Sequence, residues 1–234
     1  FSSRAEFATA SAGAYVVFDL DCQPGPQLGR CASGRQDGIL WSRPVQDLSS
    51  NQTGSSVFDF NFDGAAEAIY AYECYLRIFD GETGAIVWSV GRSSGTAYEN
   101  PVIADVDGDF RTELVVVRNP LVESHFCPSR DPLNDTVQWT EGSGVVVYRD
   151  PQDAWAASRP VWNQHAYWVT NIENDGTVPR SSLVQRNWQR TELNNFRQNT
   201  QGELEGLGTP DLTVRPVQEQ VVLSCDESGR AVVS

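Results

Sequence analysis

Short apolar runs, each ending at a polar or glycine-containing turn, recur along much of this chain. Examples are A-Y-V-V-F-D at residues 14–19, A-I-Y-A-Y at 68–72 and G-V-V-V-Y at 144–148. These runs are rich in the β-branched and aromatic residues that strands favour, and turn-forming residues bound them. The pattern therefore predicts an all-β protein built from many short strands.

One pattern of apolar and acidic residues occurs twice. Residues 57–67 read V-F-D-F-N-F-D-G-A-A-E, and residues 103–113 read I-A-D-V-D-G-D-F-R-T-E. Oxygen-bearing side chains stand at the same spacings in both copies: Asp59, Asn61, Asp63 and Glu67 in the first acidic loop, and Asp105, Asp107, Asp109 and Glu113 in the second. Carboxylates this close repel one another unless a cation offsets them, and oxygen ligands at alternate positions suit Ca²⁺. Each acidic loop is therefore predicted to bind calcium.

The two acidic loops differ from an EF-hand. The closing glutamate stands at the ninth position of each loop instead of the twelfth, and strand-like residues flank both loops. Asp105 follows Asp59 by 46 residues, which lies within the ~40–50 residues typical of propeller blades made of short strands. The spacing favours strand-loop-strand calcium sites in a β-propeller or part of one.

The two loops and the intervening L-R-I-F-D-G-E-T-G-A-I-V-W, residues 76–88, resemble the FG-GAP or VCBS repeat. This repeat occurs in integrin-α-like β-propellers and in large secreted bacterial surface proteins of the myxobacterial type. The resemblance covers roughly residues 36–150 and implies calcium in each acidic loop and a D-G-x-T-G hairpin that closes a strand pair. Gly64 fits the family pattern, whereas Phe110 stands where the family has glycine. We therefore expect the second loop to turn differently and to bind calcium less tightly.

The resemblance suggests a division of the chain into two regions. We expect an FG-GAP-like propeller region at residues 1–208, with calcium blades at about 47–92 and 93–150, a polar surface loop at 119–141 and a Trp-rich closing segment at 151–208. Residues 209–234 are predicted to be a linker and the first strands of an Ig-like sandwich. Two calcium blades and one degenerate blade are too few for a closed propeller of four to eight blades. Closure then requires the Trp-rich segment, further sequence or another subunit.

Charge and cysteine content narrow the class of protein. A net charge of −14 argues against a nucleic-acid partner, because binding phosphate needs clustered Lys and Arg. The chain has no run of ~20 apolar residues that would predict a transmembrane segment. Its five cysteines fit an oxidising compartment, which predicts a secreted or cell-surface location.

The positions of the cysteines suggest two bridges. Cys22 and Cys31 flank a loop that contains proline and glycine, so they form either a local disulfide or two free thiols. Cys74 and Cys127 are candidates for a second bridge, and Cys225 is then left over.

Residues 155–179 gather aromatic and amide side chains, and two interpretations remain open. In one, the aromatic rings stack on sugars and the amides supply hydrogen bonds, as in a lectin; in the other, the rings pack the segment against the propeller and the amides satisfy buried backbone groups. The candidate ligand-binding residues are Trp162, Asn163, His165, Tyr167 and Trp168. Since no motif marks a nucleophile for His165, a structural, hydrogen-bonded histidine is favoured over a catalytic one.

Taken together, these features predict a calcium-stabilised extracellular module for binding or assembly. Its partner would be a protein or glycan on a surface, or further copies of itself. The alternative is an enzyme, because propellers also host glycan-cleaving lyases and quinone-dependent dehydrogenases, with the active site in the central channel. No catalytic residue is assigned, and the sequence favours the binding module. The adhesive role rests on the resemblance alone, because a fold does not fix a function.

Overall fold

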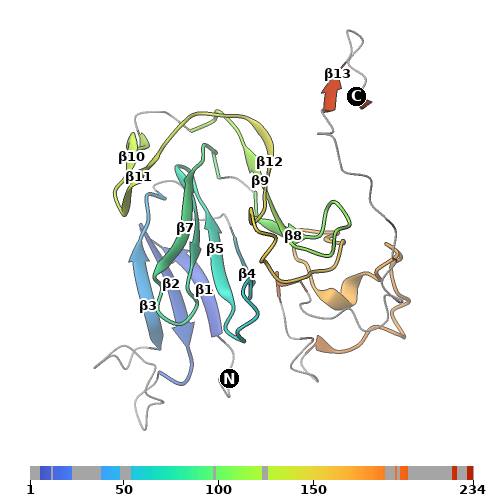
Figure 1. The fold of residues 1–234 in the computed structure, drawn as a ribbon. Helices are drawn as coiled ribbons and strands as arrows, with labels where there is room; N and C mark the ends of the chain where they lie inside the picture. Colours follow the sequence, from blue (N-terminus) through green and yellow to red (C-terminus); the bar gives the residue numbers. More distant parts are fainter. Residues whose placement is uncertain are drawn as a thin grey trace. The chain divides into compact units, whose positions relative to one another are not determined.

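The computed structural model describes residues 6–11, 13–22, 38–47, 54–96, 99–122, 126–187, 193, 196–199, 223–225 and 231–233. The chain divides into two compact units, Phe1–Glu203 and Leu204–Ser234. The described part of the first unit consists of short β-strands and irregular segments, with a single-turn 3-10 helix, η2 (Val169–Asn171) (Figure 1). The prediction of an all-β protein is confirmed.

Three antiparallel sheets of three or four strands form most of the described part of the first unit (Figure 1). The first has the order β1 (Glu6–Ser11), β2 (Ala14–Asp19), β3 (Ile39–Pro44). The central sheet has the order β4 (Ser55–Phe58), β5 (Glu67–Ala71), β6 (Tyr75–Phe79), β7 (Ile86–Gly91). The third has the order β12 (Gly144–Tyr148), β9 (Glu113–Arg118), β8 (Val102–Ala104).

The two middle strands of the central sheet are buried on both faces. Every residue of β5 and β6 is buried, and successive side chains of a strand point to opposite faces. On one face, Tyr70 and Phe79 pack against Tyr15 and Trp41 of the first sheet, with the Tyr15 and Tyr70 rings stacked at 4.6 Å. Both faces of these two strands therefore contribute to the core, which explains their nearly continuous run of apolar and aromatic residues.

The other face of the central sheet packs against the third sheet. Ile69 and Ile78 share a second core cluster with Ile103, Leu114 and Val116. Each acidic loop joins the first two strands of its own sheet: the first loop connects β4 to β5, and the second connects β8 to β9. The repeat in the sequence thus corresponds to a repeat in structure.

The D-G-E-T-G turn closes the β6–β7 hairpin, as the sequence predicted. The Asp80 side chain accepts a hydrogen bond from the Thr83 N–H at 2.7 Å, and Gly84 has a φ of 69°. A side chain at Gly84 would collide with the Trp41 ring, whose indole N–H donates to the Gly81 carbonyl at 2.8 Å. Glycine at position 84 allows both the left-handed turn and the close contact with β3.

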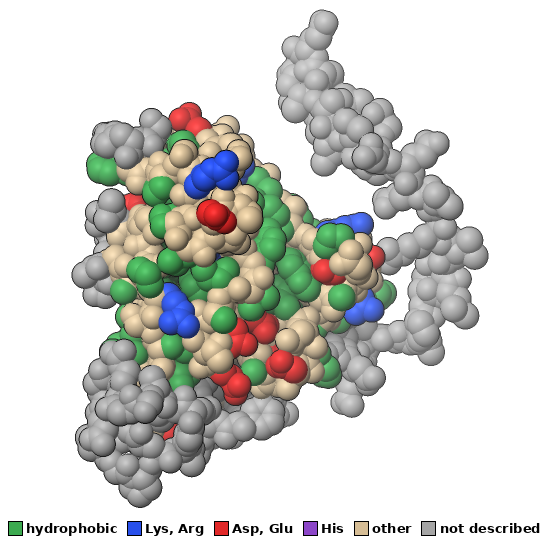
Figure 2. Space-filling model, turned by 60° about the vertical axis from the view of Figure 1, so that its left-hand side comes forward, with side chains coloured by type: hydrophobic (Ala, Val, Ile, Leu, Met, Phe, Trp, Pro, Cys, Tyr) green, Lys and Arg blue, Asp and Glu red, His purple; other side chains and the backbone are tan. Residues whose placement is uncertain are grey.

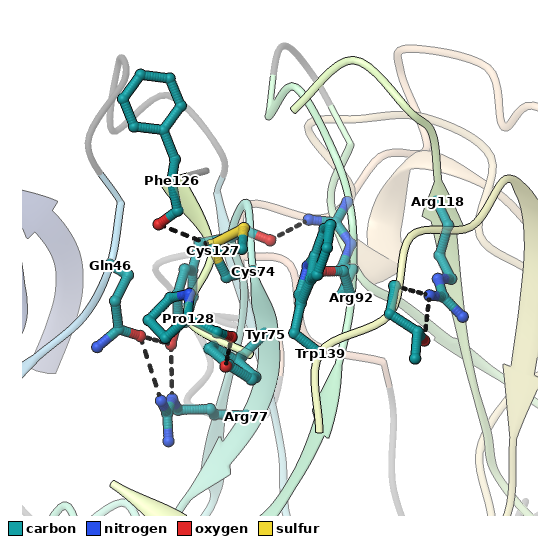
Figure 3. Close-up of a disulfide and its surroundings, with 12 residues drawn as sticks. Gln46, Cys74, Tyr75, Arg77, Arg92, Arg118, Phe126, Cys127, Pro128 and Trp139 are labelled. Atoms are coloured by element: carbon teal, nitrogen blue, oxygen red, sulfur yellow. Dashed lines mark hydrogen bonds between the residues drawn. A yellow bond between two sulfur atoms is a disulfide. The ribbon is translucent and has the colours of Figure 1, made fainter. Parts of the chain in front are cut away.

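The prediction of a polar surface loop at 119–141 is met in part: most of its described residues are exposed or half-buried, but it also contains strands and buried residues. This insertion contains the hairpin of β10 (Arg130–Asp131) and β11 (Asn134–Gln138), and its Cys127 forms a disulfide with Cys74 (Figure 3). Asp131 is buried and pairs with the buried Arg77 of β6 at 2.6 Å. The insertion therefore covers part of the central sheet, and the polar composition concealed this because its buried residues act through a bridge and an ion pair.

Other expectations are met in part or lie outside the described residues. The described sheets are small and do not close into a barrel, so the propeller stays a prediction. Cys22 is disulfide-bonded, and Cys31 lies outside the described residues. Among the described residues, no helix is long and apolar enough to cross a membrane.

The second unit is described only at two short strands. β13 (Leu223–Cys225) and β14 (Ala231–Val233) form an antiparallel pair. The rest of residues 209–234 lies outside the described residues, so the Ig-like sandwich stays a prediction.

Removing the Cys74–Cys127 disulfide should lower stability strongly. The bridge spans a sequence separation of 53 residues, and constraining a loop of that length in the unfolded chain corresponds to about 4 kcal/mol. We expect the double variant Cys74→Ala/Cys127→Ala to lose stability of this order in urea unfolding. Reductant should then destabilise the variant much less than the wild type. Equal stability of variant and wild type in oxidising buffer would contradict the assignment.

Candidate functional site

The two acidic loops bury their ends and expose their middles. In the first loop, Asp59 and Glu67 are 5% and 6% exposed, whereas Asn61 and Asp63 are exposed. The second loop repeats this pattern, with buried Asp105 and Glu113 at 4% and 2%, an exposed Asp107 and a half-buried Asp109. Each loop therefore presents oxygen atoms to solvent above a pair of buried carboxylates.

The first aspartate of each loop organises the backbone. The Asp59 carboxylate accepts hydrogen bonds from the N–H groups of Asp63 at 3.1 Å and Gly64 at 2.8 Å. Asp105 accepts the equivalent bonds from Asp109 at 3.2 Å and Phe110 at 3.0 Å. The same hydrogen bonds at the same spacing show that the two loops share one backbone shape.

Phenylalanine and glycine exchange places between the loops. Phe62 and Gly64 of the first loop have φ values of 58° and 91°, and the equivalent Gly108 and Phe110 have 79° and 68°. Both loops thus place two residues in the left-handed region, one glycine and one phenylalanine, in opposite order. The expectation that Phe110 would make the second loop turn differently is wrong. Phe110 adopts the conformation of Gly64, and the hydrogen bond to Asp105 helps to hold it there.

The closing glutamate of each loop accepts a hydrogen bond from a backbone N–H near the start of the loop. One carboxylate oxygen of Glu67 accepts from the Phe60 N–H at 2.8 Å, and one of Glu113 accepts from the Val106 N–H at 2.9 Å. The other oxygen of Glu113 is buried without a hydrogen-bond partner among the described residues. Such an atom is costly unless something else binds it.

The electrostatics of both glutamates reflect this burial. Desolvation by burial, together with the nearby carboxylates of Asp107, Asp109 and Asp105, raises the pKa of Glu113 to about 7, against the opposing hydrogen bond from the Val106 N–H. Burial likewise raises the pKa of Glu67, with smaller contributions from Asp59 and Asp63. The ionised glutamates are therefore disfavoured unless a positive charge lies nearby.

The second loop brings three carboxylates together. One oxygen from each of Asp105, Asp107 and Asp109 lies within 4.8 Å of the others. The first loop has Asn61 at the position of Asp107, so its set consists of two carboxylates and an amide before the closing glutamate. Every candidate ligand atom is an oxygen, and one buried carboxylate oxygen of Glu113 has no hydrogen-bond partner among the described residues. Both features fit a hard divalent cation.

Residues 155–159 connect the two loops. The Ala156 N–H donates to the Phe60 carbonyl at 2.8 Å, and the Thr112 hydroxyl donates to the Ala156 carbonyl at 2.6 Å. The Asp105 N–H donates to the Arg159 carbonyl at 3.3 Å.

Figure 2 shows acidic side chains gathered on one face of the molecule, beside a band of hydrophobic side chains.

The candidate ligand-binding residues of the Trp-rich segment differ in their burial. Tyr167 is fully buried, and its ring stacks on Trp162 with centroids 4.5 Å apart. Its hydroxyl contacts Arg159 and Asn199. Tyr167 is therefore unavailable to a sugar, and for this residue the packing interpretation holds.

The other candidates of this segment lie nearer the surface. Trp168 is half-buried against Phe196, at 5.2 Å between ring centroids, while Asn163 and His165 are exposed. Both ring nitrogens of His165 lie within 3.3 Å of an Arg197 nitrogen, and burial and this guanidinium lower the pKa of the imidazole. This contact fits a structural histidine.

Two features of the site were not predicted. The buried Arg159 donates to the carbonyls of Val169 at 2.9 Å and Ile172 at 2.6 Å, which folds the Trp-rich segment around one guanidinium. A cavity of about 350 Å³ lies beside the first acidic loop and is lined by Trp88, Tyr148 and Trp155. Trp88 lies 60 or more residues before Tyr148 and Trp155, so no local pattern indicated that the three rings meet.

Comparisons with known proteins give one solved structure similar to this chain. It is the crystal structure of the V. cholerae biofilm matrix protein Bap1, with a TM-score of 0.62 and 29% sequence identity over 82% of this chain. The chain spans 27% of the length of that protein. No family model matches the chain, and no curated protein matches it.

Exchanging the phenylalanine and glycine of the second loop should be tolerated. The double variant Gly108→Phe/Phe110→Gly reproduces the order of the first loop and keeps one glycine at a left-handed position. Gly108→Ala alone leaves no glycine there and should cost about 1 kcal/mol, although nothing lies within 4 Å of the added methyl group. Chemical denaturation of both variants checks this. A double variant less stable than Gly108→Ala would show that the loops are not equivalent.

Proposed function

We propose that this chain is a calcium-stabilised extracellular module that mediates adhesion or assembly. The observation that carries the proposal is the repeated acidic loop: two segments 46 residues apart share one backbone shape and carry oxygen-bearing side chains at the same spacings. The unpartnered buried oxygen of Glu113 supports a cation in the second loop.

Each loop supplies the ligands for one calcium ion. The proposed ligands are Asp59, Asn61, Asp63 and Glu67 in the first loop, and Asp105, Asp107, Asp109 and Glu113 in the second. Bound Ca²⁺ would offset the repulsion within each carboxylate cluster. The aspartates and glutamates already bind backbone N–H groups across the loop, so the ion would fix the connection between the first two strands of a sheet.

The adhesive or assembly role has a separate support. The solved structure similar to this chain belongs to a biofilm matrix protein, and the Cys74–Cys127 disulfide fits an oxidising, extracellular setting. We propose a secreted or surface-exposed module that contacts a glycan or protein on a surface, or other copies of itself. An FG-GAP-like propeller is the finer fold that we propose, on the sequence resemblance.

Calcium should raise the stability of the folded chain. An ion that binds only the folded state adds about 2.7 kcal/mol per site at a hundredfold excess over Kd, which corresponds to a rise in Tm of roughly 5–10 °C for a chain of this size. Thermal melts in Ca²⁺ and in chelator measure the difference, with Mg²⁺ as the comparison ion.

Single substitutions test whether the acidic loops cause the calcium-dependent rise in Tm. Asp63→Asn and Asp107→Asn remove exposed carboxylates and should each lose part of the calcium-dependent rise with little change in chelator. Asp135→Asn, which removes an exposed carboxylate on β11, should keep the full rise. A wild-type Tm that is the same in Ca²⁺ and in chelator would refute the calcium sites.

A further inference from the structure

The aromatic cavity beside the first acidic loop has the features of a ligand site. Its volume of about 350 Å³ lies within the ~300–1,000 Å³ of small-molecule pockets. Phe60, Trp88, Tyr148 and Trp155 supply aromatic surface to its lining, and Arg149 and Asp150 supply charged groups. An apolar cavity with a few polar groups at its rim is the usual composition of a binding pocket.

The aromatic walls form two ring pairs. Trp88 of β7 and Tyr148 of β12 meet edge to face, with centroids 5.1 Å apart at 67°. Phe60 of the first acidic loop and Trp155 lie 4.6 Å apart at 52°. Trp88, Tyr148 and Trp155 are half-buried, so each ring is packed on one part and open on another. The cavity therefore offers aromatic surface held in place by neighbouring rings.

The segment that carries Trp155 is fixed on both sides. One carboxylate oxygen of Asp150 accepts from the N–H groups of Gln152 at 3.0 Å and Ala154 at 3.1 Å. After Trp155, the Ala156 N–H donates to the Phe60 carbonyl at 2.8 Å. This preorganisation reduces the entropy that a ligand would lose by ordering the wall of its own site.

The rim supplies hydrogen-bonding groups of both kinds. Arg149 is 56% exposed, and its guanidinium lies 3.7 Å from the Asp107 carboxylate, which is itself 49% exposed. Such a solvent-exposed ion pair contributes little to stability. The Arg149 guanidinium N–H groups can therefore bind a ligand at a small cost in free energy. Asp150 and Asn61 add carboxylate and amide groups at the same cavity.

We propose that this cavity binds a neutral glycan. A pyranose ring has an apolar face that stacks on aromatic side chains and hydroxyl groups at its edge that bond to charged and amide groups, and the cavity has both. This assignment rests on the proposed binding function and gives it a partner and a place. The ligand is uncharged because the first acidic loop lines the cavity at Asn61 and Glu67, Asp150 lines it as well, and the chain has a net charge of −14. An anionic sugar chain would be repelled.

Calorimetry with soluble cello-oligosaccharides and chito-oligosaccharides tests the proposal, with polygalacturonate as the acidic comparison and Ca²⁺ present throughout. We expect saturable binding of a neutral oligosaccharide and none of polygalacturonate. Trp155→Ala should weaken binding about tenfold, and Trp155→Phe, which keeps a ring, should weaken it less.

A pair of matched surface variants locates the site even if Trp155→Ala fails to fold. Val87 lines the cavity and is 61% exposed, whereas Val145 is 66% exposed and does not line it. Val87→Arg should abolish binding and Val145→Arg should leave it unchanged. The proposal is overturned by no binding of either neutral series, by binding of polygalacturonate alone, or by equal effects of the two arginine variants. The calcium melts are independent of these results, so a failure here leaves the calcium module standing.

Discussion

Burial of the two middle strands of the central sheet on both faces is the constraint on which the rest of the structure depends. Strands β5 and β6 have no exposed residue, so they are stable only when the first and third sheets cover them. The most demanding position is Arg77, whose side chain is fully buried in β6. Removing its partner would leave an uncompensated charge in the core, at a cost of roughly 3–5 kcal/mol.

The insertion at 119–141 supplies the partner of that charge. The Asp131 carboxylate lies 2.6 Å from the Arg77 guanidinium, which also lies over the rings of Tyr72 and Tyr75. The Cys74–Cys127 disulfide joins the insertion to the turn between β5 and β6. A polar segment thereby becomes part of the core. The disulfide holds the insertion near the sheet, and the ion pair sets where it docks.

The sequence predicted what is local or repeated, and missed what depends on distant partners. Short apolar runs rich in β-branched and aromatic residues identified β2, β5 and β12, and the D-G-E-T-G motif identified the β6–β7 turn, because both signals lie within a few residues. Phe110 was misjudged because its left-handed conformation is held by hydrogen bonds to Asp105, which composition does not reveal. The Arg77–Asp131 pair and the aromatic cavity join residues more than 50 positions apart, and a single sequence has no pattern for such pairs.

The first acidic loop and the cavity share Phe60, and this makes the two sites dependent on each other. The Phe60 N–H is held by the Glu67 carboxylate, its carbonyl accepts from Ala156, and its ring packs on Trp155. A cation that stabilises ionised Glu67 would therefore also fix Phe60, and through it the aromatic wall. Since coupling between two binding sites is reciprocal, a ligand in the cavity would in turn raise the affinity of the first loop for its ion. The second loop bonds to the same 155–159 segment through Thr112 and Asp105. Hydrogen bonds thus join both acidic loops to the segment that carries Trp155, so a cation in either loop would act on the wall of the cavity.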